Sequence, residues 1–129
     1  MPSLKEIPSS SAVLRSSDAR GRLLDLQRHY ALVSDESLIA VALEEVPALY
    51  ALLKDAAEPL RLAFGEGNLL QLEALESDEG IILRVMVILP SRTENGADLM
   101  RGFQRSWWLK NCSRAEASLV FDYEIGDGV

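Results

Sequence analysis

The sequence predicts an α+β protein in which N-terminal helices precede a β-hairpin, a further helix and a last strand. Between Leu49 and Ala63, apolar residues recur every three or four positions, which is the spacing of an amphipathic helix. From Leu70 the spacing changes to two, as in a strand with one buried face. A second alternating segment follows at 119–125. We expect the strands to form a small three-stranded, mostly antiparallel sheet packed on the helices.

The length of 129 residues and the globular composition fit a single domain. We expect a flexible lead-in at 1–16, one α+β domain at 17–125 and a frayed tail at 126–129. Cys112 is the only cysteine, so no internal disulfide can form, and a reducing cytoplasmic location is the simplest expectation. No apolar run approaches the roughly 20 residues that a membrane helix needs.

The first half of the domain has the start and stop signals of helices. Ser17-Asp18 is suited to cap a short helix that runs toward Tyr30, and Ser34-Asp35-Glu36 is a stronger helix start. Pro47 interrupts the next apolar pattern, because proline lacks the amide donor and is best tolerated in a first helical turn. Gly65 supplies a C-cap. The expected helices after Tyr30 span about 35–45 and 47–64.

The hairpin strands are expected at 68–76 and 81–89, joined by the polar turn residues 77–80. The second strand is apolar on both faces apart from Arg84, which is typical of a central strand or of one covered on both sides. A right-handed crossover would nevertheless place the last strand parallel to it, with the first hairpin strand in the middle. Both placements stay open, and the outer face of the second strand is a candidate interface.

Trp107 and Trp108 stand at the end of a helix expected at 97–109, in which Met100, Phe103 and Trp107 share one face. Adjacent residues on a helix point about 100° apart. Both rings can therefore close the core, or Trp108 can contact a partner, since exposed tryptophan is favoured at protein interfaces.

The net charge of −7 is unevenly distributed along the chain. Residues 1–33 carry five basic and three acidic residues, a net of +2, which leaves −9 for the remainder. Binding to DNA or RNA normally relies on lysine and arginine at the phosphates. We therefore expect no nucleic-acid partner for the acidic body of the protein.

No residue pattern points to catalysis or to a cofactor. His29 is the only histidine, and the sequence shows no nucleophile or carboxylate that would be expected beside it. Gly65-Glu66-Gly67 follows a helix and precedes a strand, the reverse of a dinucleotide fingerprint. If the first and last strands were neighbours, the carboxylates of three residues would approach one another as a candidate Mg²⁺ or Ca²⁺ site; the alternative is a solvated, salt-bridged face. These residues are Glu73, Asp122 and Glu124.

Several segments between about residues 27 and 125 carry a resemblance through their order and spacing. They are His29–Glu36, the helix led by Pro47, Phe64-Gly65 before Leu70–Glu73, Phe103-x-x-x-Trp107-Trp108-Leu109 and Leu119–Glu124. Together they resemble a family of small uncharacterised bacterial proteins. Relatives usually have an acidic residue on each side of the tryptophan pair, whereas here Gln104-Arg105-Ser106 precedes it and Lys110 follows it. The resemblance implies a single α+β domain and no transferable activity.

These observations predict a small cytoplasmic bacterial protein that acts through protein–protein contact, with a homodimer as one form of that contact. One alternative is an antitoxin-like or immunity-like inhibitor that neutralises a basic partner with its acidic body. The other, from a different class, is a metal-dependent enzyme that uses the three carboxylates. The residues expected to contact a partner are Arg84, Met86, Ile88 and Trp108.

Overall fold

Helices form where capping residues and apolar spacing coincide in the sequence. The computed structural model describes residues 17–126. Asp35 caps α3 by accepting a hydrogen bond from the Ser37 amide at 2.9 Å, and the hydrogen bonds from Ser37 hold the pKa of Asp35 below its usual value. Gly65 ends α4 at a φ of +93°, which favours glycine. The helices are α2 (Ser17–Gln27), α3 (Glu36–Glu45) and α4 (Ala48–Phe64), as the sequence predicted.

Four strands form one mixed, open sheet in the order β1-β2-β3-β4. The hairpin strands β2 and β3 are antiparallel, with Ser77 opposite Gly80 across a two-residue turn. The pairs β1–β2 and β3–β4 are parallel. The strands are β1 (Ala31–Leu32), β2 (Leu69–Ser77), β3 (Gly80–Leu89) and β4 (Leu119–Ile125).

The sheet corrects two predictions. It has four strands instead of three, because the short strand β1 pairs with β2 in parallel. It is also mixed instead of mostly antiparallel, because β4 lies beside β3 and not beside β2. The physical reason is the apolar character of β3 on both faces: a strand of that kind is best placed between neighbours. The expected parallel orientation of the last strand relative to the second is confirmed.

The crossover from β3 to β4 is one nearly continuous helical segment, residues 96–115. It begins beside β4, where Gly96 lies so close to Tyr123 that an added Cβ would stand 2.6 Å from the tyrosine ring. The segment contains a π-helical turn at the tryptophan pair, a feature that the helical spacing did not predict. Its parts are α5 (Gly96–Phe103), the π-helical turn Gln104–Trp108, α6 (Leu109–Asn111) and a 3-10 turn at Cys112–Ala115.

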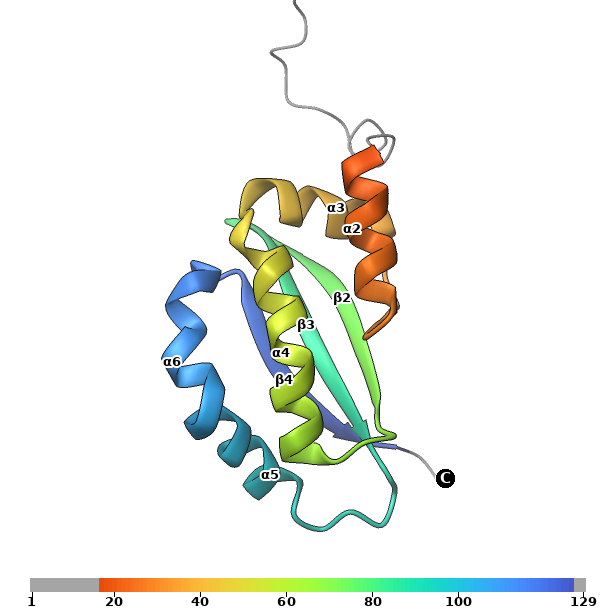
Figure 1. The fold of residues 1–129 in the computed structure, drawn as a ribbon, viewed down its shortest axis with the longest axis vertical. Coiled ribbons are helices and arrows are strands. Elements are labelled where there is room, and N and C mark those ends of the chain that lie inside the picture. Colours follow the sequence, from red (N-terminus) through yellow and green to blue (C-terminus); the bar gives the residue numbers. More distant parts are fainter. Residues whose placement is uncertain (1–16, 127–129) are drawn as a thin grey trace, which may run out of the picture.

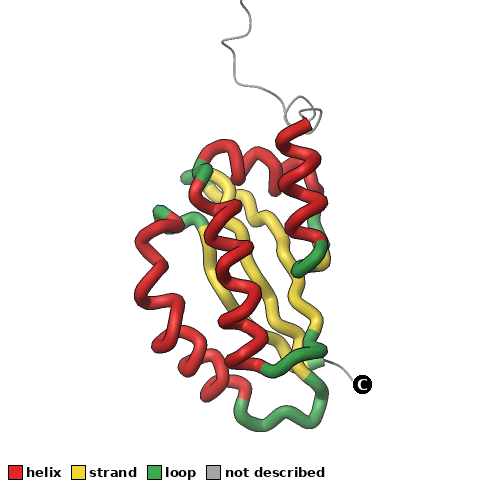
Figure 2. The backbone as a smooth tube through the Cα atoms, viewed as in Figure 1, coloured by secondary structure: helices red, strands yellow, loops and turns green. Residues whose placement is uncertain are grey.

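The helices lie against one face of the sheet, as Figures 1 and 2 show. We call this the inner face. Its β3 residues Leu83, Val85, Val87 and Leu89 are buried, whereas the alternate residues of β3 are only half-buried. The opposite or outer face is therefore covered by no element within residues 17–126.

The predicted end regions fall almost entirely outside the residues that the structure describes. The expected lead-in at 1–16 lies outside them, as do residues 127–129 of the expected tail. Gly126 is described, and its amide donates a hydrogen bond to the Leu89 carbonyl at 2.7 Å. The sheet pairing therefore continues one residue past β4.

Candidate functional site

The outer face of the sheet is an apolar surface that the helices leave uncovered. It consists of the side chains that alternate away from the core on β2, β3 and β4. Cross-strand partners bring them together: Leu69 lies opposite Ile88, and Leu75 opposite Ile82. Leu69 is 48% exposed and Val120 42% exposed. Its apolar members are Leu69, Leu75, Ile82, Met86, Ile88 and Val120.

An ion pair lies among these apolar side chains. Arg84 on β3 stands directly opposite Glu73 on β2, and one guanidinium nitrogen donates to both carboxylate oxygens of Glu73, at 2.8 and 3.0 Å. The Arg84 side chain is 32% exposed and the Glu73 side chain 21% exposed. The pair neutralises its own charges, so the middle of the outer face carries no net charge.

The carboxylates considered as a metal site are not brought together. Glu73 is on β2, whereas Asp122 and Glu124 are on β4, and β3 lies between the two strands. Asp122 is instead the neighbour of Met86 and Glu124 the neighbour of Ile88. In the described part of the chain, no three acidic, histidine or cysteine side chains form a group that could hold a metal ion. The condition on which the metal-dependent enzyme rested is therefore not met.

The two tryptophans pack on the inner side of the sheet, away from the outer face. The Trp107 ring stacks on Phe103 at 5.8 Å between centroids. The Trp108 ring meets Phe121 of β4 edge-on at 4.7 Å and stacks on Trp107 at 6.1 Å. Both tryptophans are half-buried. Trp108 is thus separated from Arg84, Met86 and Ile88, and the four predicted contact residues divide between two places.

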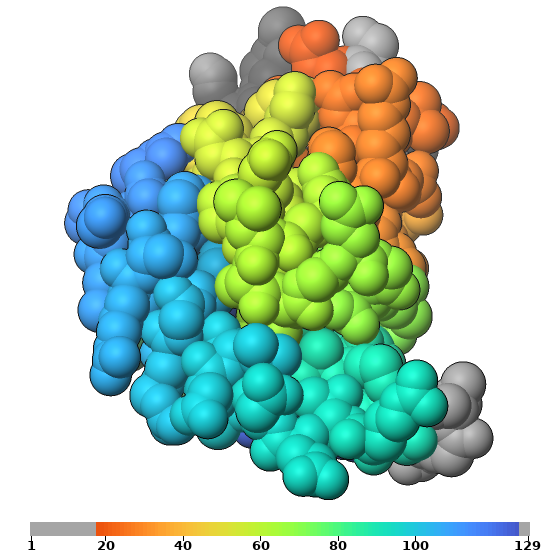
Figure 3. All heavy atoms as spheres, turned by 60° about the horizontal axis from the view of Figure 1, so that its bottom comes forward, coloured from red at the N-terminus to blue at the C-terminus, as the bar shows by residue number. Residues whose placement is uncertain are grey.

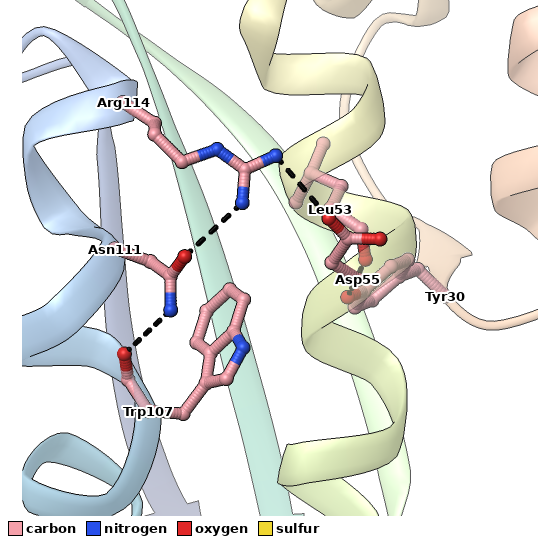
Figure 4. A network of polar contacts seen from close by, with 6 residues as sticks. All are labelled: Tyr30, Leu53, Asp55, Trp107, Asn111 and Arg114. Carbon is pink, nitrogen blue, oxygen red and sulfur yellow. Dashed lines mark hydrogen bonds and ion pairs between the residues drawn. The ribbon is translucent and has the colours of Figure 1, made fainter.

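A polar network fixes the helical segment 96–115 against α4 (Figure 4). The Asn111 amide donates to the Trp107 carbonyl at 2.9 Å, which satisfies a backbone group at the π-helical turn. Arg114 donates to Asn111 at 3.1 Å and pairs with Asp55 of α4 at 3.2 Å. These contacts hold the tryptophan pair in position at the edge strand β4.

A shallow groove of about 500 Å³ lies between α4 and α5, and Figure 3 shows α4 and the segment 96–115 side by side at the surface. Leu62, Leu99 and Trp107 contribute apolar walls. Of the described residues that line it, Asp98 alone has a titratable side chain, and it pairs with Arg101. The groove therefore has apolar contact area but no set of groups for acid–base or nucleophilic chemistry.

His29 and Cys112 are not placed as catalytic groups. His29 packs its ring edge-on against Tyr30 at 6.3 Å, and within residues 17–126 no hydrogen bond or ion pair reaches that ring. The thiol of Cys112 contacts the Leu109 carbonyl of its own helix at 3.7 Å. Among the residues that the structure describes, neither His29 nor Cys112 has the oriented partner that nucleophilic or general-base catalysis requires.

The sequence predicted part of the outer face. Arg84, Met86 and Ile88 were identified because β3 is apolar on both sides. The flanking Leu69 and Leu75 were missed, since the polar Gln71 and Glu73 between them made this face of β2 look solvated. The available signal was that Leu69 and Leu75 lie two residues from Gln71 and Glu73, and residues two apart on a strand share a face.

No helix in the described region has the length and apolar character to cross a membrane. Comparison with known proteins finds no match to a family model, to a curated protein or to a solved structure. The resemblance to a family of small bacterial proteins therefore stays a prediction.

Proposed function

We propose that the protein is a small cytoplasmic bacterial accessory protein that acts by binding another protein through the outer face of its sheet. The observation that carries this proposal is the uncovered apolar surface around the Glu73–Arg84 ion pair. Contiguous exposed apolar side chains with polar residues around them are typical of interaction sites. An arginine set among apolar side chains is also a common feature of the energetically dominant centre of an interface.

The charges beside this surface favour a basic partner. Asp122 and Glu124 lie on the same side of the sheet as Met86 and Ile88, and neither belongs to an ion pair within residues 17–126. Two copies of the chain would bring equal negative charges together, whereas a partner with lysine or arginine around an apolar patch would be attracted. We therefore commit to a different, basic protein over a homodimer.

We predict that Met86→Lys weakens partner binding by roughly tenfold or more, because the new positive charge would repel a basic partner and the apolar contact of Met86 would be lost. The new cation would stand beside Asp122, so the fold itself should tolerate it. The partner would be recovered from the native host with the tagged full-length chain, and its affinity for each variant measured by titration with the purified proteins.

The matched control is Leu24→Lys, which makes a similar apolar-to-lysine change at a residue 65% exposed on α2. It should leave binding unchanged. Equal binding by both variants would contradict the outer face as the site. If light scattering showed a dimer, and Met86→Lys dissociated that dimer, the partner at the outer face would be a second copy of the chain and not a basic protein.

The second candidate function is inhibition of a basic toxic partner, as in an antitoxin or an immunity protein. The carboxylates of Asp122 and Glu124, which form no ion pair within residues 17–126, favour it, since complementary charge accelerates association. The association rate should then fall steeply with added salt. The partner's own activity should be lost in the complex. A partner that stays active when saturated with this protein would exclude inhibition and leave the accessory role.

A further inference from the structure

The outermost strand, β4, has an open edge. The Leu83 amide donates to the Ser118 carbonyl at 2.8 Å, and the Gly126 amide donates to the Leu89 carbonyl at 2.7 Å. In a parallel pair the hydrogen bonds recur every second residue, so the even-numbered residues from Ser118 to Gly126 face β3. The backbone groups of the odd-numbered residues face away from the sheet.

Almost nothing occupies these outward groups in the part of the chain that is described. The Tyr123 amide donates to the carboxylate of the preceding residue, Asp122, at 2.8 Å. No other residue within 17–126 makes a hydrogen bond to the outward amides of Phe121 and Ile125. A row of free donors and acceptors of this kind is a template for a further strand.

At the opposite end of the sheet, the two-residue strand β1 and the residues after it already occupy part of the edge of β2. There β1 pairs with β2, and the Val33 amide extends the pairing to the Leu72 carbonyl at 3.0 Å. The Ser34 hydroxyl then accepts from the Ala74 amide at 2.8 Å, where a longer β1 would have placed a carbonyl. An added strand is therefore expected at β4 and not at β2.

The helix layer reaches past β4. Figures 1 and 2 show α6 beyond β4, outside the last strand of the sheet. Trp108, the last residue of the π-helical turn before α6, packs its ring against Phe121 of β4 and remains half-buried. A strand added beside β4 would therefore pair with β4 on one side and would lie close to the Trp108 ring of the helix layer. Strands inside the sheet have the same kind of surroundings.

We propose that β4 binds an extended segment of a partner protein as a fifth strand, with basic side chains at alternate positions. Val120, Asp122 and Glu124 point to the outer side along this edge. Basic side chains of the added strand would lie beside the two carboxylates, and apolar ones would face Phe121 and Trp108. Main-chain hydrogen bonds supply affinity in such additions, and alternate side chains supply specificity.

A second copy of the chain does not fit this edge. In the antiparallel pairing of two β4 strands that is centred on Tyr123, Asp122 of each copy would lie opposite Glu124 of the other, and like charges directly opposite destabilise a sheet. The carboxylates therefore act against self-pairing and admit a cationic strand. This inference concerns the edge and goes beyond the proposed role of the outer face.

The test titrates the ¹⁵N-labelled full-length chain with a short, end-blocked peptide that alternates valine and lysine. We expect saturable shifts of the Phe121, Tyr123 and Ile125 amides and of the Trp108 indole. A peptide with glutamate in place of lysine should not bind. The lysine peptide with N-methyl groups on the alternate amides that would face β4 should also fail to bind. It keeps the positive charge but cannot donate backbone hydrogen bonds to β4.

Two variants locate the site. Ile125→Pro removes an outward donor at the strand end and should weaken peptide binding roughly tenfold, since proline is tolerated at sheet edges but cannot donate. Glu124→Gln should weaken it roughly two- to fivefold, whereas Glu45→Gln on α3 should have no effect. Shifts that miss β4, or equal binding of the N-methylated peptide, would overturn the proposal, and neither result bears on Met86 and the outer face.

Discussion

Replacing Phe103 by alanine is expected to cost about 3–5 kcal/mol of unfolding free energy. Phe103 is fully buried, and its ring packs against Phe121 at 4.9 Å and against Trp107 at 5.8 Å. Truncation removes the apolar contact that joins α5 to β4 and leaves a cavity that the surrounding rings fill only in part. Because small domains are stable by about 5–15 kcal/mol in total, this single change should remove a large fraction of the stability.

Urea unfolding followed by circular dichroism and by tryptophan fluorescence measures this effect. Leu109→Ala is the matched control on the same helical segment: Leu109 is 65% exposed, so its truncation should change stability by less than about 0.5 kcal/mol. The Phe103 variant should also shift the tryptophan emission to longer wavelength, because water gains access to the aromatic cluster. A loss below about 1 kcal/mol would show that Phe103 does not anchor β4.

The local structure could be predicted because it depends on local patterns. Asp35 and Gly65 mark helix ends through capping and through a positive φ, both of which are properties of one or two residues. The alternation of Phe121, Tyr123 and Ile125 with the acidic residues Asp122 and Glu124 identified β4 and its buried side. In each case the sequence signal and the physical cause lie within a few residues of each other.

The order of the strands could not be predicted from such patterns. A crossover rule states that β3 and β4 are parallel, but it does not say whether β2 lies between them. The two-residue strand Ala31–Leu32 is too short to show an alternating pattern. The π-helical turn at Gln104–Trp108 depends on how two adjacent rings pack against Phe121, which is a tertiary effect.

Prediction of the candidate site likewise succeeded within one strand and failed where it needed the order of the strands. Arg84, Met86 and Ile88 could be identified together because they alternate along one strand. Glu73 and Asp122 could be combined only by assuming a strand order, and that order proved wrong. Residues on one strand were therefore reliable evidence for a shared surface, whereas residues on different strands were not.

The two proposed binding surfaces meet at β4. Asp122 lies beside Met86 of the outer face and at the same time caps the edge amide of Tyr123. A basic segment added at this edge would extend the outer face by one strand, with its basic side chains on that side beside Asp122. A partner that used both surfaces would gain affinity from backbone pairing and from apolar burial.

The pH dependence of stability should reveal the buried hydroxyl of Tyr30. Tyr30 is 2% exposed, and its hydroxyl donates to the Leu53 carbonyl of α4 at 2.6 Å (Figure 4). Burial raises the pKa of Tyr30 well above its usual value, against a smaller opposing effect of Arg61. The folded protein therefore keeps this proton at a pH where the unfolded chain, with a tyrosine pKa of about 10, has released it.

The sign of the effect follows from this difference. The stabilisation is fully present below about pH 10 and is lost as the pH rises, and the folding equilibrium constant should fall by about tenfold per pH unit. Tyr30→Phe removes this titration and costs about 1 kcal/mol at neutral pH through the lost hydrogen bond. The two stability curves should therefore converge above pH 10 and cross within about one further pH unit. Urea unfolding of both proteins from neutral to strongly alkaline pH tests this, and parallel curves would mean that Tyr30 ionises as easily in the folded state as in the unfolded one.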